Sequence, residues 1–210
     1  MQRDGPPPAV RDFLKRQGDK KITHMYIGRT PIHSAINTFL NALSFGALNK
    51  TRKKLGYDDI YHNYLLVRTS DGRLWKLEKN HVVRAVPASS ADTKNEIHSI
   101  PVDKDIDINT LISTASRGDK EFWKYNPRDK NCQWFAKDII VGNNLDKNVD
   151  NETREVIQPQ SGDKLLDSLG ALKEVPKGIT DFASGLDTLV YGQGIKKKIT
   201  VDQLFDLANK

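Results

Sequence analysis

The clearest pattern in the chain is an alternation of apolar and polar positions on both sides of an Asp-Gly pair. Residues 60–69 (IYHNYLLVRT) are rich in β-branched and aromatic side chains, residues 73–78 (RLWKLE) alternate apolar and polar side chains, and Ser70-Asp71-Gly72 separates the two segments. Glycine tolerates the positive φ that a tight turn between antiparallel strands requires. The pattern therefore predicts a β-hairpin, followed by a third strand over 81–86 that stops before Pro87.

The remaining segments mix strand and helix signals. Alternation predicts strands over 21–29 and 96–102, whereas apolar residues at helical spacing, often after a capping residue, predict four helices. These helices lie over 8–16, 32–47, 107–117 and 131–141. The mixture predicts an α+β fold: a small antiparallel sheet with the 131–141 helix packed on it.

Changes in composition divide the chain into four parts. Residues 1–28 are a lead-in with a Pro6-Pro7-Pro8 run and one strand, and residues 29–144 are the α+β domain. Residues 145–164 are polar and weakly patterned, which predicts a linker. Residues 165–210 carry apolar residues at helical spacing and a basic cluster, which predicts a helical extension.

Composition narrows the classes of protein that need considering. The chain has 210 residues, of which 37% are hydrophobic. This content is sufficient for a hydrophobic core and excludes a fully disordered chain. The chain has one cysteine, so neither an internal disulfide nor a thiolate-rich zinc site is expected. Its net charge of +6 favours anionic surfaces in general, without indicating nucleic acid or lipid. The histidines lack metal-ligand spacing, and we expect no metal and no cofactor. Without a secretory signal or a long apolar run, we expect an intracellular, reducing compartment, which for a viral protein is the host cytoplasm or the virion.

The single cysteine, Cys132, begins the predicted helix over 131–141. The unpaired N–H groups and the dipole of a helix start favour a thiolate there. His62 begins the predicted hairpin, where a strand can hold an imidazole rigidly, and a thiol with such an imidazole makes a cysteine nucleophile. The N–H groups of Cys132 and Gln133 would stabilise an oxyanion. The alternative is that Cys132 is a small buried hydrophobic residue.

The segments around these two residues resemble a known superfamily. Asn131-Cys132-Gln133-Trp134-Phe135 (NCQWF) and the hairpin that opens with His62 are similar to the Asn-Cys motif and His-box of lecithin:retinol acyltransferase-like proteins. The pattern GYDDIYHNYLLVR…DGRLWKLEKN is also similar to uncharacterised proteins of large DNA viruses and related mobile elements. The resemblance covers residues 29–144. It implies a circularly permuted papain-like fold with His62 as base and Cys132 as nucleophile.

One position departs from that superfamily. Lys76 stands where the acyltransferases have a second histidine, and a lysine cannot accept a hydrogen bond from an imidazole. Glu78 lies two residues further along the same strand face, and its carboxylate is our candidate for orienting His62. A surface ion pair is the alternative for Glu78. Gln133, Asn131 and Lys76 are candidates for supporting the oxyanion and the site around it, although Asn131 is equally suited to cap the helix.

These observations predict a cysteine-dependent hydrolase or acyltransferase acting on an ester or amide carbonyl through an acyl-enzyme. The resemblance favours a lipid ester, with a cysteine protease or isopeptidase as a second version of the same chemistry. The hypothesis from a different class is a non-catalytic structural or interaction protein, virion-associated and built on the same fold.

Two regions are candidates for contact with a phospholipid membrane surface or a partner. The 32–47 helix has an apolar face followed by basic residues, as interfacial helices do, although a core-facing helix has the same stripe. The basic cluster of the extension would dock on other virion proteins, and nucleic acid is not required. The candidate contact residues are Ile36, Phe39, Leu43, Lys196, Lys197 and Lys198.

Overall fold

The computed structural model describes residues 5–32, 47–80, 82–126, 128–160 and 164. They fall into two compact units. The first takes in the described residues up to Thr30, from His62 to Asn126 and from Lys130 to Pro159. The described residues between Pro31 and Tyr61, together with residues 128, 129, 160 and 164, belong to the second. The expected contact residues Ile36, Phe39, Leu43, Lys196, Lys197 and Lys198 lie outside the described residues.

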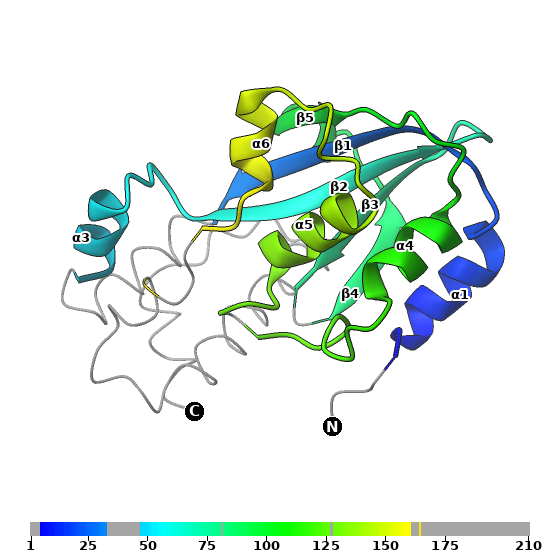
Figure 1. Ribbon diagram of the computed structural model, residues 1–210, viewed down its shortest axis with the longest axis horizontal. Coiled ribbons are helices and arrows are strands. Elements are labelled where there is room, and N and C mark those ends of the chain that lie inside the picture. The colour runs from blue at the N-terminus through cyan, green and yellow to red at the C-terminus, as the bar shows by residue number, and fades with distance from the viewer. Residues whose placement is uncertain (1–4, 33–46, 81, 127, 161–163, 165–210) are drawn as a thin grey trace. The chain divides into compact units, whose positions relative to one another are not determined.

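The first unit is built on a five-stranded antiparallel sheet with the strand order β4-β3-β2-β1-β5 (Figure 1). Its strands are β1 (Ile22–Pro31), β2 (Tyr61–Thr69), β3 (Leu74–Lys79), β4 (Val83–Pro87) and β5 (Glu96–Ile100). The expected hairpin is β2 and β3, and Gly72 in its turn has the positive φ (82°) that the Asp-Gly pair predicts. The small antiparallel sheet and the mixed α+β class are thus confirmed.

Helices cover one face of this sheet. They are α1 (Pro8–Gln17), α4 (Ile108–Ser116), α5 (Cys132–Gly142) and α6 (Asn151–Ile157). Helix α5 contacts β3 and α4, and α1 contacts β4. The core between sheet and helices contains Leu65 and Val67 of β2, Leu77 of β3, and Phe135 and Ile139 of α5. Successive strand residues point to opposite faces, so the odd-numbered positions of β2 and β3 face the helices.

The even-numbered positions of β2 and β3 point to the other face, which a chain segment crosses. Strands β4 and β5 are the two edges of the sheet, so the connection over 88–95 has to pass over its middle strands. Tyr64 is fully buried beneath this crossover, and its hydroxyl donates a 2.7 Å hydrogen bond to the Asp92 carbonyl. The neighbouring strand has Gly28 here, because a Cβ at that position would collide with the Tyr64 ring.

Two segments differ from the expected organisation. The lead-in supplies β1, which lies between β2 and β5 inside the sheet. The expected linker over 145–164 contains α6, where Val156 and Ile157 are buried in the core and Asp150 caps the helix through the Thr153 N–H. So short a helix has too few apolar positions to reveal a period, and that is why its sequence pattern is weak.

The second unit contains α3 (Ala47–Lys54), whose last turn is basic. Arg52 of this helix contacts the Asp59 carboxylate at 3.4 Å. The Gln160 amide accepts a hydrogen bond from the Tyr61 N–H at 3.0 Å and donates one to the Asp59 carbonyl at 2.6 Å. Throughout the described part of the chain, every helix is too short or too polar to cross a bilayer.

Candidate active site

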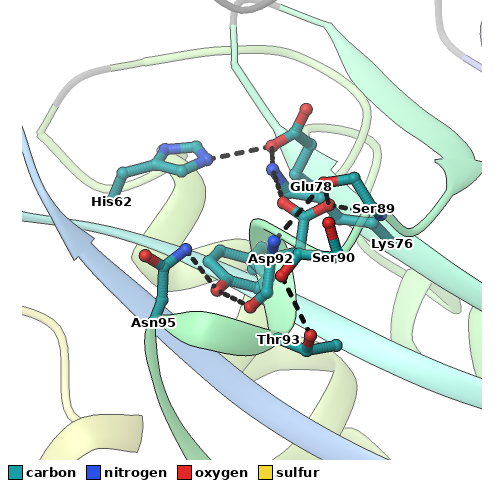
Figure 2. Close-up of polar contacts among 9 residues, drawn as sticks. His62, Lys76, Glu78, Ser89, Ser90, Asp92, Thr93 and Asn95 are labelled. Carbon is teal, nitrogen blue, oxygen red and sulfur yellow. Dashed lines mark hydrogen bonds and ion pairs between the residues drawn. The ribbon is translucent and has the colours of Figure 1, made fainter.

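The structure brings His62 and Glu78 together. Glu78 lies directly opposite Tyr64 in the β2–β3 register, and His62 precedes Tyr64 by two residues, so all three share one face. The His62 Nε2 lies 3.2 Å from the Glu78 Oε2, a distance at which the ring N–H donates to the carboxylate (Figure 2). Both side chains are largely buried, with 18% of His62 and 9% of Glu78 exposed. The contact is the one we expected from an orienting carboxylate, and its role in catalysis remains a prediction.

Lys76 adds further charged contacts to this pair. Its Nζ lies 2.9 Å from the same Glu78 Oε2 and 3.0 Å from Asp92 Oδ1 (Figure 2). The ammonium also lies 4.7 Å from the centre of the Tyr64 ring, where a cation is attracted to the aromatic face. Lys76 therefore contacts the carboxylate that contacts His62, which is a different role from that of a second histidine.

These charged groups stabilise one another. Burial alone would raise the pKa of Glu78, but the hydrogen bond from His62 and the charge of Lys76 lower it to about 2. Burial alone would lower the pKa of Lys76, but the carboxylates of Glu78 and Asp92 raise it above its ordinary value. Glu78 is therefore ionised and Lys76 protonated throughout the neutral pH range.

Asp92 anchors the crossover over this face. Its carboxylate accepts hydrogen bonds from the backbone N–H (2.7 Å) and the hydroxyl (2.6 Å) of Ser89. Thr93 donates to the Ser90 carbonyl at 3.1 Å, and the Asn95 amide donates to the Tyr64 hydroxyl at 3.0 Å (Figure 2). The segment 88–95 is thus fastened to the sheet through Tyr64 and Lys76, next to the His62–Glu78 pair.

Cys132 is the first residue of α5 and is half-buried. The preceding Asn131 caps the helix: its side-chain oxygen accepts hydrogen bonds from the N–H groups of Gln133 (2.9 Å) and Trp134 (3.3 Å). Of the two roles weighed for Asn131, the structure shows the cap. The Gln133 N–H, expected to face an oxyanion, is engaged by this cap, and the Gln133 side chain is buried.

The end of β3, at Lys79, shows where Cys132 and His62 lie relative to the sheet. Lys79 follows Glu78 in the sequence, and its side chain points to the helix-covered face. Helix α5 contacts β3, and Cys132 is among the groups that act electrostatically on Lys79, so the start of α5 lies near the end of β3 at which His62 is found. The alternation nevertheless assigns His62 to the crossover face and α5 to the other. The start of α5 and His62 are thus assigned to one end of the sheet and to opposite faces of it.

Lys79 is a buried cation that was not among the residues expected at the site. It is 2% exposed, and its Nζ donates a 2.6 Å hydrogen bond to the Phe122 carbonyl. Burial and the nearby charge of Lys130 lower its pKa to about 8, although negative charges nearby partly offset this effect. The sequence does indicate that Lys79 is buried, because the alternation along β3 places it on the same apolar face as Trp75 and Leu77.

Within the described residues, no group of three or more His, Cys, Asp and Glu side chains is arranged to hold a metal ion. Comparisons with models of protein families, with curated proteins and with solved structures found no match to this chain. The geometry of the residues themselves therefore carries the functional argument.

Proposed function

We propose that this protein is a cysteine-dependent hydrolase or acyltransferase in which His62 takes the proton of Cys132. The observation that carries the proposal is the 3.2 Å contact between the His62 Nε2 and the Glu78 carboxylate. An imidazole held by an ionised, buried carboxylate has a defined tautomer, and its positive form is stabilised once it takes a proton. Such a pair is suited to act as a general base.

The chemistry would proceed in two stages. With Nε2–H held by Glu78, the Nδ1 of His62 is the atom that removes the thiol proton. The Cys132 thiolate then attacks an ester or amide carbonyl, and the imidazolium returns its proton to the leaving alcohol or amine. Water or a second acceptor attacks the resulting thioester and releases Cys132. The pKa of Glu78, at about 2, keeps the carboxylate charged throughout this cycle.

The position of Cys132 supports its part in this reaction. It begins α5, where the helix dipole favours a thiolate, and it is half-buried rather than sealed in the core. For His62 to take the thiol proton, the Cys132 side chain must reach past the end of β3. We take the substrate to be a lipid ester and the topology to be permuted papain-like, on the strength of the acyltransferase resemblance. Cleavage of a peptide or isopeptide bond would use the same residues.

A second candidate is a non-catalytic interaction protein on the same α+β fold, with the virion as one setting. The observation that favours it is the assignment of His62 and α5 to opposite faces of the sheet. Under this reading the His62–Glu78–Lys76–Asp92 chain serves to fasten the crossover, and Cys132 is an ordinary thiol. The two candidates make opposite predictions about the reactivity of Cys132.

The test is the rate at which iodoacetamide alkylates Cys132 between pH 5 and pH 10, followed by intact mass. Because Cys132 is the only cysteine, the signal has a single source. We expect a reactive thiolate well below the ordinary thiol pKa of roughly 8.5, and a shift toward that value in His62→Ala. The matched control is His98→Ala, which removes a histidine paired with Glu96 at 2.9 Å on the edge strand β5.

The outcome separates the two candidates. A profile with the pKa of an ordinary thiol, unchanged by His62→Ala, refutes the enzyme and favours the interaction protein. If the enzyme is supported, an activated ester such as p-nitrophenyl butyrate should add one acyl group to the wild type and none to Cys132→Ala. Comparison of long-chain phospholipid esters with peptide amides then identifies the substrate class.

A further inference from the structure

Lys76 and His62 contact the same oxygen atom. The Oε2 of Glu78 lies 2.9 Å from the Lys76 Nζ and 3.2 Å from the His62 Nε2. A carboxylate that contacted His62 alone would act on the imidazole with its full negative charge, and a buried pair of this kind favours the protonated ring. A protonated imidazole cannot accept the proton of a thiol. The ammonium next to the shared oxygen opposes that effect.

We propose that Lys76 is a positioning residue for His62: by sharing the Glu78 carboxylate, it fixes the carboxylate under the imidazole and keeps the ring able to accept a proton near neutral pH. This inference rests on the proposed role of His62 as a base. It goes beyond that role because it assigns a function to the position that departs from the acyltransferase pattern. The lysine replaces the second histidine through the electrostatics of Glu78, without contacting the imidazole as that histidine would.

The crossover over 88–95 also affects the charge that acts on Glu78. Asp92 holds the other side of the Lys76 ammonium at 3.0 Å, and Asp92 is itself fixed by Ser89. Lys76 therefore has one carboxylate on each side, and the segment 88–95 determines how much of its charge acts on Glu78. Removal of the Lys76 charge and removal of the Asp92 charge should change the protonation of His62 in opposite directions.

The charged and titratable groups on this face come from four elements. Among the described residues they include Tyr64 on β2, Lys76 and Glu78 on β3, Arg84 on β4 opposite Glu78 in the register, and Asp92 in the crossover. The pKa of Tyr64 is raised, chiefly by burial, so Tyr64 is neutral in the range where histidine titrates. The variable charges to test are therefore those of Lys76 and Asp92.

The experiment is an NMR titration of the histidine ring protons in the full-length chain, with the His62 resonance assigned by its loss in His62→Ala. In Lys76→Met we expect the pKa of His62 to rise by about one unit, because a neighbouring positive charge is lost. Lys76→Arg keeps the charge and should restore the wild-type value to within a few tenths of a unit. In Asp92→Asn we expect the pKa of His62 to fall. His98, with its own Glu96 partner, is the internal reference and should not move.

An unchanged or lowered pKa in a folded Lys76→Met variant overturns the proposal. If that variant does not fold, the sign of the shift in Asp92→Asn decides, and a rise or no change there overturns it equally. The titration involves neither the thiol nor a substrate. It can therefore fail while the alkylation test of Cys132 succeeds, and the alkylation test can fail while the titration succeeds.

Discussion

Strand β3 contains two lysines whose environments predict opposite effects of the same substitution. Lys76 lies between two carboxylates, whereas Lys79 is buried against a backbone carbonyl and the Phe122 ring, 5.8 Å from its centre. The pKa of Lys79 falls from 10.5 to about 8, chiefly through burial. A difference of roughly 2.5 units corresponds to about 3 kcal/mol of destabilisation when the folded protein must hold the charge. We therefore predict that Lys79→Met stabilises the protein at pH 7.

The substitution also removes a hydrogen bond, and the cost of that loss reduces the expected stabilisation. Methionine cannot donate to the Phe122 carbonyl, which accepts a 2.6 Å hydrogen bond from the Lys79 ammonium. An unpaired buried carbonyl costs about 1–2 kcal/mol. Methionine has nearly the length of the lysine stem and leaves no large cavity. The expected net change at pH 7 is a gain in unfolding free energy of about 1–2 kcal/mol.

The sign of the effect should depend on pH. The folded pKa of Lys79 lies below the unfolded value, so the destabilisation is complete below pH 8 and disappears as the pH rises toward 10.5. Between pH 7 and pH 10, the advantage of Lys79→Met should shrink by about 2 kcal/mol. At pH 10 the lost hydrogen bond outweighs the remaining advantage, and the variant should then be less stable than the wild type.

The assay is urea denaturation at pH 7 and pH 10, monitored by tryptophan fluorescence. Lys76→Met is the matched control: removal of one partner from a largely buried ion pair should destabilise the protein by on the order of 3 kcal/mol at pH 7. Lys94→Met, at an exposed position, should change the stability by less than about 0.5 kcal/mol. If Lys79→Met destabilises equally at both pH values, then burial of the ammonium is not what governs this position.

Two further substitutions test the packing that supports the candidate site. Asn131→Ala removes the cap of α5 and should lower the unfolding free energy by about 1 kcal/mol in urea; unchanged stability would exclude a contribution from the two capping bonds. Gly28→Ala places a methyl group against the Tyr64 ring and should lower the unfolding free energy by about 1–3 kcal/mol, whereas Gly5→Ala, where an added Cβ meets no other atoms, should leave it unchanged. Equal stability of the two alanine variants would show that Tyr64 is not held against β1.

Local signals predicted the elements of this fold well where turn and cap chemistry are explicit. The Asp-Gly turn defines the β2–β3 hairpin, and Asp107 caps α4 through the Thr110 N–H, as expected from the sequence. The same local rules overlooked α6, whose few buried residues do not form a visible period. They also give no strand order: the position of β1 inside the sheet depends on pairing between segments far apart in the chain, which no local pattern encodes.

The candidate site shows the same division between local and non-local information. Alternation along β3 was enough to place Lys76 and Glu78 on one face, and the hairpin register then brings Glu78 to His62. Strand β2 does not indicate which of its faces the helices take, because each face has large buried side chains: Leu65 and Val67 on one, Tyr64 and Leu66 on the other. The crossover provides the missing information, because its passage over Tyr64 leaves only the opposite face to α5. The relation of Cys132 to His62, on which the proposed chemistry depends, is therefore determined by the route of the chain between β4 and β5, and only the folded structure reveals that route.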